Sequence, residues 1–154
     1  MIKNTYRKLL LILLTFCSVN AFAQTEEEAV KAVINQLFEG MKKGDSALIR
    51  LAFSPSATLE TVVKNREGLV RIRRESIDSF LVSIARPHTD VYDERITFEM
   101  VKIDDELALA WTPYKFYIGD KFSHCGVNSF QLVKVGGKWA IQYLIDTRRR
   151  QNCE

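Results

Sequence analysis

The sequence predicts an α+β fold in which helices near the N-terminus cover one face of a mostly antiparallel sheet. Apolar residues recur with helical spacing after residue 25 and again after residue 76. Beyond the loop at residues 86–88, the apolar pattern changes to the period of two that is typical of strands. Three pairs of turn-forming residues then divide the chain into a meander: Asp104-Asp105, Gly119-Asp120 and Gly136-Gly137.

The first 23 residues have the three parts of a secretory signal peptide. A basic segment precedes an apolar stretch at residues 9–16, and the motif Ala21-Phe22-Ala23 follows. The apolar stretch is shorter than the roughly 20 residues that span a bilayer. We therefore expect cleavage before Gln24, a mature domain over residues 24–154, and export to the periplasm or beyond.

Composition excludes several classes of protein. The chain has 22 basic and 19 acidic residues, and three of the basic ones lie within residues 1–23. The mature domain is therefore neutral, and the basic pI gives no evidence for nucleic-acid binding. The length suits one domain and is too short for an eightfold β/α barrel. Phosphate-binding, serine-nucleophile and zinc-protease motifs are absent from the sequence, so we expect no metal and no cofactor.

Three helices are predicted, and each begins at a residue whose side chain can cap a helix N-terminus. The first helix has an apolar face from Val30 to Met41 and ends at Gly44. The second is short, over residues 46–51, and a β-hairpin of residues 57–63 and 68–73 precedes the third. The capping residues are Thr25, which forms a capping box with Glu28, then Asp45 and Ser76.

Tight turns at the three positions fix which residues of the meander lie side by side. Under these registers most large apolar residues share one face, which we expect the helices to cover. The layers of this inner face are Phe98, Trp111, Asn128 and Ile145, then Met100, Leu109, Phe130 and Tyr143, then Lys102, Leu107, Leu132 and Ile141. The convex face then carries Tyr114, Phe116, Ile118, Val127, Val133 and Leu144.

The order of elements resembles the nuclear transport factor 2-like, or cystatin-like, superfamily. The residues that carry the resemblance are Lys43-Gly44-Asp45, Phe53-Ser54-Pro55 and the last hairpin over 128–141. SnoaL-like cyclases, ketosteroid isomerases and the proteins named "putative lumazine-binding" belong to this group. The resemblance covers nearly the whole mature chain. It implies a strongly curved sheet with a cone-shaped pocket, and a homodimer through the convex sheet face, but not one activity.

A polar cluster is predicted where the registers are extended toward the far end of the sheet, with Glu94, Lys115, His124 and Arg149 in one layer. His124 beside a carboxylate has the chemistry of a general base, whereas the charged residues alone fit a solvated ion-pair patch equally well. Asn128 lies among aromatic residues and needs a partner, which is a ligand, a helix or a water. The candidate ligand-binding residues are Phe98, Trp111, Asn128, Tyr143, His124 and Glu94.

These observations support three hypotheses of function. The first is an exported, non-catalytic protein that binds a small apolar or aromatic molecule and no cofactor. The second is a cofactor-free isomerase, dehydratase or cyclase with His124 as base and Asn128 or Tyr143 polarising a carbonyl. The third is a dimeric assembly or accessory protein.

Cys125 and Cys153 are the two cysteines of the mature domain. An oxidising compartment permits a disulfide between them. The bond also requires the C-terminal tail to fold back, so pairing and free thiols are both left open.

Overall fold

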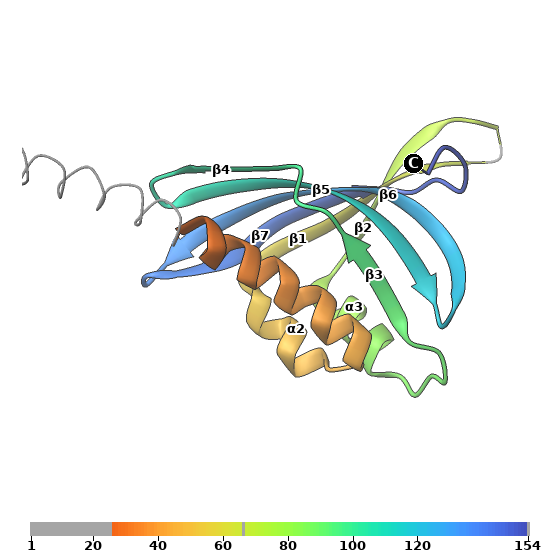
Figure 1. Cartoon of the computed structure of the whole chain (residues 1–154), viewed down its shortest axis with the longest axis horizontal. Coiled ribbons are helices and arrows are strands. Elements are labelled where there is room, and N and C mark those ends of the chain that lie inside the picture. The colour runs from red at the N-terminus through yellow and green to blue at the C-terminus, as the bar shows by residue number, and fades with distance from the viewer. Residues whose placement is uncertain (1–25, 66, 154) are drawn as a thin grey trace, which may run out of the picture.

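The computed structural model describes residues 26–65 and 67–153. The predicted signal peptide, its cleavage site and the Thr25 cap lie outside the described residues. Within them, three helices lie on one side of a seven-stranded sheet (Figure 1). This confirms the predicted α+β class. No helix in the described ranges is long and apolar enough to cross a membrane.

The helices begin and end where their capping residues predict. The first helix is described over residues 26–43 and is orange in Figure 1. Helix α2 spans Ser46–Ala52, and a carboxylate oxygen of Asp45 accepts a hydrogen bond from the Leu48 amide at 2.9 Å. Helix α3 spans Ile77–Ala85, and the hydroxyl of Ser76 accepts one from the Ser79 amide at 3.1 Å. Both side-chain caps satisfy amides that a helix N-terminus leaves without partners.

The sheet is mixed but mostly antiparallel. Its order is β2-β1-β7-β6-β5-β3, β4 also pairs with β5, and the β1–β7 pair is parallel. The predicted hairpin before α3 is confirmed as β1 and β2. The strands are β1 Phe53–Lys64, β2 Val70–Glu75, β3 Tyr92–Ile96, β4 Met100–Asp104, β5 Leu107–Ile118, β6 Lys121–Val135 and β7 Lys138–Thr147.

The strong curvature that the resemblance implies is not confirmed. The long strands β5, β6 and β7 bend only gently, and the sheet is not strongly curled (Figure 1). The helices therefore cover an open sheet and lie over part of its inner face.

A one-residue shift near the β5–β6 turn reverses the predicted face of β5. The register changes between Phe116 and Tyr117, so that Trp111 pairs with Ser129 instead of Asn128. Such a bulge reverses the face of every β5 side chain on the far side of it from the turn, relative to the predicted pairing with β6. Ala108, Ala110 and Thr112 consequently face the helices and are buried, whereas the side chain of Trp111 is 41% exposed on the outer face.

A second shift, between Gln131 and Leu132, does the same in β7. Leu144 and Asp146 point inward beyond it, and the predicted inner residues Tyr143 and Ile145 alternate to the outer face. The side chains of β4 also face the opposite way to the prediction. Val101 and Ile103 pack against the core, and Met100 is exposed. The predicted layers were therefore wrong for five inner residues besides Lys102 and Leu107: Met100, Trp111, Leu109, Tyr143 and Ile145. Four residues predicted on the convex face lie on the inner one: Tyr114, Phe116, Ile118 and Leu144.

The core forms where the first helix crosses β6 and β7. Its apolar face is buried as predicted, and the ring of Phe38 meets Phe130 edge to face at 6.2 Å. At the start of this helix, Glu26 accepts hydrogen bonds from Trp139 at 2.8 Å and from Lys134 at 2.7 Å. These bonds fix the helix over the β6–β7 hairpin, which places its other end above the site described next.

Candidate functional site

One pocket lies between the helices and the inner face of the sheet. The cavity volume is about 70 Å³, and the empty space of the site is about 510 Å³ when open solvent is included. Apolar side chains form part of its lining. They come from the first helix, from β1, from α3 and from β7: Leu37, Phe38, Met41, Leu59, Phe80 and Leu144.

Polar residues complete the lining, and most come from strand positions that face the helices. They are Thr61, Glu75, Glu94, Asn128, Asp146 and Arg148, while Glu60 borders the pocket with its side chain on the outer face. A mostly apolar lining with a few polar groups is the usual composition of a ligand site.

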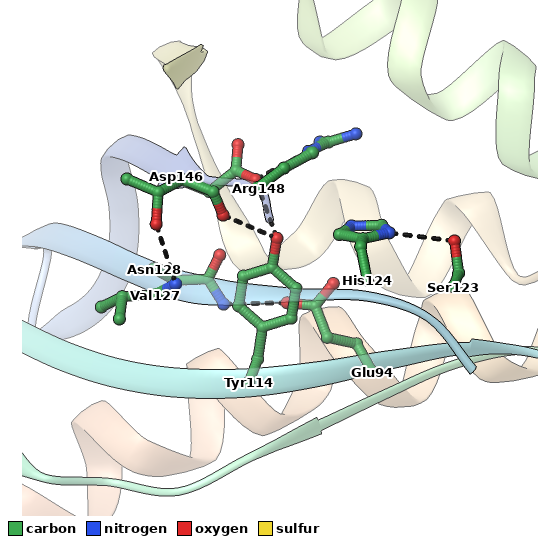
Figure 2. A network of polar contacts seen from close by, with 9 residues as sticks. Glu94, Tyr114, Ser123, His124, Val127, Asn128, Asp146 and Arg148 are labelled. Carbon is green, nitrogen blue, oxygen red and sulfur yellow. Dashed lines mark hydrogen bonds and ion pairs between the residues drawn. The ribbon is translucent and has the colours of Figure 1, made fainter. Parts of the chain in front are cut away.

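Glu94 and Asn128 form the innermost polar contact. The amide nitrogen of Asn128 donates to a carboxylate oxygen of Glu94 at 2.8 Å (Figure 2). Asn128 is buried, with 3% of its surface exposed. The pKa of Glu94 is raised to about 7. Burial is the main cause and the negative charge of Asp146 adds to it, while the Asn128 hydrogen bond and the charge of Arg148 act in the opposite direction. Near neutral pH this carboxyl is therefore divided between its acid and base forms.

Asp146 is the centre of a second group of contacts. Its carboxylate accepts a hydrogen bond from the Arg148 side chain at 2.8 Å and from the Tyr114 hydroxyl at 3.2 Å (Figure 2). Tyr114 also lies 2.9 Å from the carbonyl oxygen of Thr147, to which its hydroxyl can donate. Burial and the nearby charge of Asp146 raise the pKa of Tyr114, so this phenol stays neutral.

The end of β7 approaches β6 closely because residue 126 is glycine. A Cβ atom on Gly126 would lie 1.8 Å from the Thr147 carbonyl oxygen. Beyond this point Cys125 and Arg149 exchange two backbone hydrogen bonds, of 2.9 and 2.8 Å. The structure also contains a Cys125–Cys153 disulfide, with a Cα–Cα distance of 5.8 Å. Arg148 is thus held at the pocket by anchored residues on both sides.

His124 lies on the inner face but does not line the pocket. Its ring contacts Tyr114 and Phe116, with centroid distances of 5.7 and 5.0 Å, and its Nδ1 lies 3.0 Å from the Ser123 hydroxyl (Figure 2). Burial lowers the pKa of His124, and the positive charge of Arg148 lowers it further. Lys115 pairs with Cys125 in the sheet and is exposed, so the predicted four-residue cluster does not form around it.

Three of the six candidate ligand-binding residues lie away from the pocket. Trp111 is on the outer face, as described above. Tyr143 is there too, and its hydroxyl donates to Glu60 at 2.6 Å. Phe98 packs against the core near the first helix, where the Lys31 ammonium lies 5.8 Å from its ring centroid. Glu94 and Asn128 line the pocket, and His124 lies beside it.

Asp146 and Arg148 are the residues that sequence reasoning missed, because the predicted register of the last strand puts them on the convex face together with Leu144. The shift in β7 brings them inward. Their alternation as Asp146-Thr147-Arg148 shows only that they share a face and does not indicate which one.

The comparison with known families identifies the chain. A family model for proteins described as "Putative lumazine-binding" matches residues 25–142. The chain belongs to this family. The predicted resemblance is thereby confirmed, because the "putative lumazine-binding" proteins are among the members of the superfamily that the sequence resembles. No protein of curated function matches the sequence.

Solved structures similar to this "putative lumazine-binding" chain share its fold. A nuclear transport factor 2-like protein of unknown function from Shewanella baltica is 23% identical, with a TM-score of 0.64 over 82% of this chain and 96% of that one. A protein of unknown function from Mycobacterium tuberculosis is 17% identical, with a TM-score of 0.68 over 86% and 76%. The beta subunit of a putative aromatic-ring-hydroxylating dioxygenase from Novosphingobium aromaticivorans is 10% identical, with a TM-score of 0.69 over 85% and 94%.

Metal-binding side chains do not gather in the part of the chain that the structure describes. No group of three or more histidines, cysteines or acids is close enough there to hold an ion.

Proposed function

We propose that this protein binds a small molecule in the pocket between the first helix and strands β3, β6 and β7. The observation that carries the proposal is the contact of Glu94 with Asn128 at the polar end of an apolar-walled pocket. Buried polar pairs cost stability unless they are satisfied, and such groups commonly orient a ligand. The family's name also refers to binding of a small molecule.

The shape of the pocket limits its ligand. A cavity volume of about 70 Å³ accepts only a small head group, so a larger apolar or aromatic body has to extend into the open part of the pocket. The head group meets hydrogen-bonding side chains, so we expect it to be polar. This refines the expectation of a purely apolar or aromatic ligand.

Native mass spectrometry of the protein purified from its own host tests the proposal. We expect a bound small molecule that is lost from the Asn128→Leu variant, which removes the polar end at similar volume. Gln131→Leu is the matched control, because Gln131 lies on the same strand and is exposed. Retention of the same molecule by Asn128→Leu, or its loss from Gln131→Leu, would contradict the assignment.

Acid–base catalysis is a second candidate function, and the pKa of Glu94 near 7 favours it. In this alternative Glu94 takes the role of base that the sequence suggested for His124. Exchange of the methyl protons of acetophenone in D₂O, followed by NMR, tests it. We expect faster exchange with the protein than with buffer, and loss of that difference in Glu94→Gln but not in His124→Ala.

We further propose that the protein is exported and reaches an oxidising compartment. The leader-like pattern of residues 1–23 and the Cys125–Cys153 disulfide both support this, because disulfides persist outside the cytosol. N-terminal sequencing of the exported protein should return Gln24-Thr25-Glu26. An intact Met1 on the exported protein would contradict the proposal.

A further inference from the structure

We propose that the pocket selects an organic cation, namely a primary ammonium group carried by an aromatic or aliphatic body. This inference rests on the proposed binding function and adds the charge of the ligand's polar end. It starts from the charges that line the pocket. Arg148 is the one cation among the described lining residues, and the carboxylates that face the pocket are those of Glu75, Glu94 and Asp146.

One of these carboxylates already has a cationic partner. Arg148 lies 2.8 Å from Asp146. The guanidinium that could attract an anionic ligand is therefore neutralised by Asp146. Among the described residues, neither Glu75 nor Glu94 forms an ion pair, so the pocket keeps an excess of negative charge.

Glu94 is the carboxylate best placed to meet a ligand cation. Asn128 donates to one of its oxygens, which leaves the other free to accept. The first helix and α3 present carbon atoms to the pocket through Phe38, Met41 and Phe80. A charge–charge contact is strongest where water is excluded in this way.

The groups around Glu94 do not supply the missing positive charge. Strand β7 contributes Asp146, which repels a negative Glu94, and the residue that follows the strand is Arg148, which is paired with Asp146. Strand β5 contributes the neutral phenol of Tyr114, and β6 the imidazole of His124, whose pKa is lowered. The raised pKa of Glu94 reflects this lack of compensation, which a bound ammonium group would relieve.

Calorimetric titration with three matched probes tests the inference: 2-phenylethylamine, 2-phenylethanol and 3-phenylpropionate. At pH 8 we expect the amine to bind at least about tenfold tighter than the alcohol, because a hydrogen bond to a charged group is worth about that factor. The carboxylate probe should bind most weakly. In Glu94→Gln the amine should bind no tighter than the alcohol. Glu99→Gln is the control, since Glu99 is an exposed acid outside the pocket.

The pH dependence gives a readout that needs no variant. The amine stays charged because aliphatic ammonium groups titrate near pH 10. Glu94, with a pKa of about 7, is mostly protonated at pH 6. We expect amine affinity to fall about tenfold between pH 8 and pH 6, in proportion to the ionised fraction, while alcohol affinity stays constant.

The outcomes separate this inference from the proposed function. If the alcohol binds as tightly as the amine, the inference is wrong and the binding function stands. If none of the three probes binds, both are overturned. If Glu94→Gln keeps the amine preference, the assignment to Glu94 fails. Circular dichroism and alcohol binding report whether that variant folds, and if it does not, the pH dependence of the wild-type protein decides.

Discussion

Glu94 carries a carboxyl group whose charged form is disfavoured by burial. Its neighbours hold its carboxyl away from water without an ion pair among the described residues, and its pKa rises to about 7. A carboxyl whose pKa is higher in the folded than in the unfolded chain binds more protons when folded. Folding is therefore stabilised at low pH, and that stabilisation is lost as pH rises from about 4.5 through 7.

The first prediction concerns this loss. In Glu94→Gln the titrating group is absent, so the free energy of unfolding should not show this fall. Relative to the variant, the wild-type protein should lose about 2–3 kcal/mol of stability between pH 5 and pH 8. Urea unfolding of both proteins at the two pH values measures the difference. Equal differences at both pH values would show that Glu94 titrates as an ordinary exposed carboxyl.

The Tyr114 hydroxyl provides a second prediction at the residue scale. It contacts Asp146 at 3.2 Å and the Thr147 carbonyl at 2.9 Å in a buried position. Tyr114→Phe should cost about 1–3 kcal/mol of stability, because Asp146 loses a donor that water cannot easily replace. Tyr117→Phe is the matched control, since no hydrogen bond of its hydroxyl to another described residue is found. Urea midpoints compare the two, and equal losses would contradict the role of the buried hydroxyl.

At the scale of elements, the two register shifts decide what the pocket contains. The shift between Gln131 and Leu132 turns Asp146 and Arg148 toward the helices. The shift between Phe116 and Tyr117 gives the inner face of β5 the small residues Ala108 and Ala110 instead of Leu109 and Trp111. Ala108 and Ala110 there belong to the same buried cluster as the apolar face of the first helix.

The C-terminal tail is fixed to the sheet by the disulfide, which gives the third prediction. The bond joins residues 28 apart in sequence. A loop of that length corresponds to about 3–4 kcal/mol of stabilisation through restriction of the unfolded chain. Dithiothreitol should lower the stability of the wild-type protein by that amount and leave Cys153→Ser unchanged. Two free thiols in the unfolded, unreduced protein would show that the bond does not form.

At the scale of the whole molecule, the outer face of the sheet is open in Figure 1, opposite the helices. It carries large apolar side chains along strand β5, with exposed fractions of 51% for Leu107, 39% for Leu109 and 41% for Trp111. Apolar patches of this kind commonly mark an interface. The dimer that we expected through this face remains a prediction, now with these residues in place of Tyr114, Phe116, Ile118 and Leu144.

Light scattering over a range of concentrations tests the dimer. The molar mass of the wild-type protein should rise toward twice the monomer value, and Trp111→Glu should weaken association at least about tenfold, since central tryptophans often dominate an interface. Leu51→Glu is the control, because Leu51 is 75% exposed on α2 and lies on the helical side. A mass that stays monomeric at every concentration would overturn the prediction.

Local chemistry in the sequence determined the helices. The caps at Asp45 and Ser76 and the apolar face from Val30 to Met41 depend on residues a few positions apart, so sequence alone specifies them. The inner face of β6, with Asn128, Phe130 and Leu132, was also predicted correctly.

Glu94 and His124 were placed on one face for a subtler reason. The predicted registers placed Glu94 beside Lys115 and Lys115 beside His124. In the structure Glu94 pairs with Phe116 and Phe116 pairs with His124, so the one-residue errors in the two registers cancel.

Tertiary structure alone decided the faces of β5 and of the end of β7. Whether a bulge is stable depends on how both sheet faces then pack against distant elements. The residue types near Phe116 and Gln131 do not indicate a bulge. Asp146, Arg148 and the apolar wall from the first helix therefore meet Glu94 and Asn128 only in the folded chain. The sequence determined the elements and the family, and packing determined which side chains form the pocket.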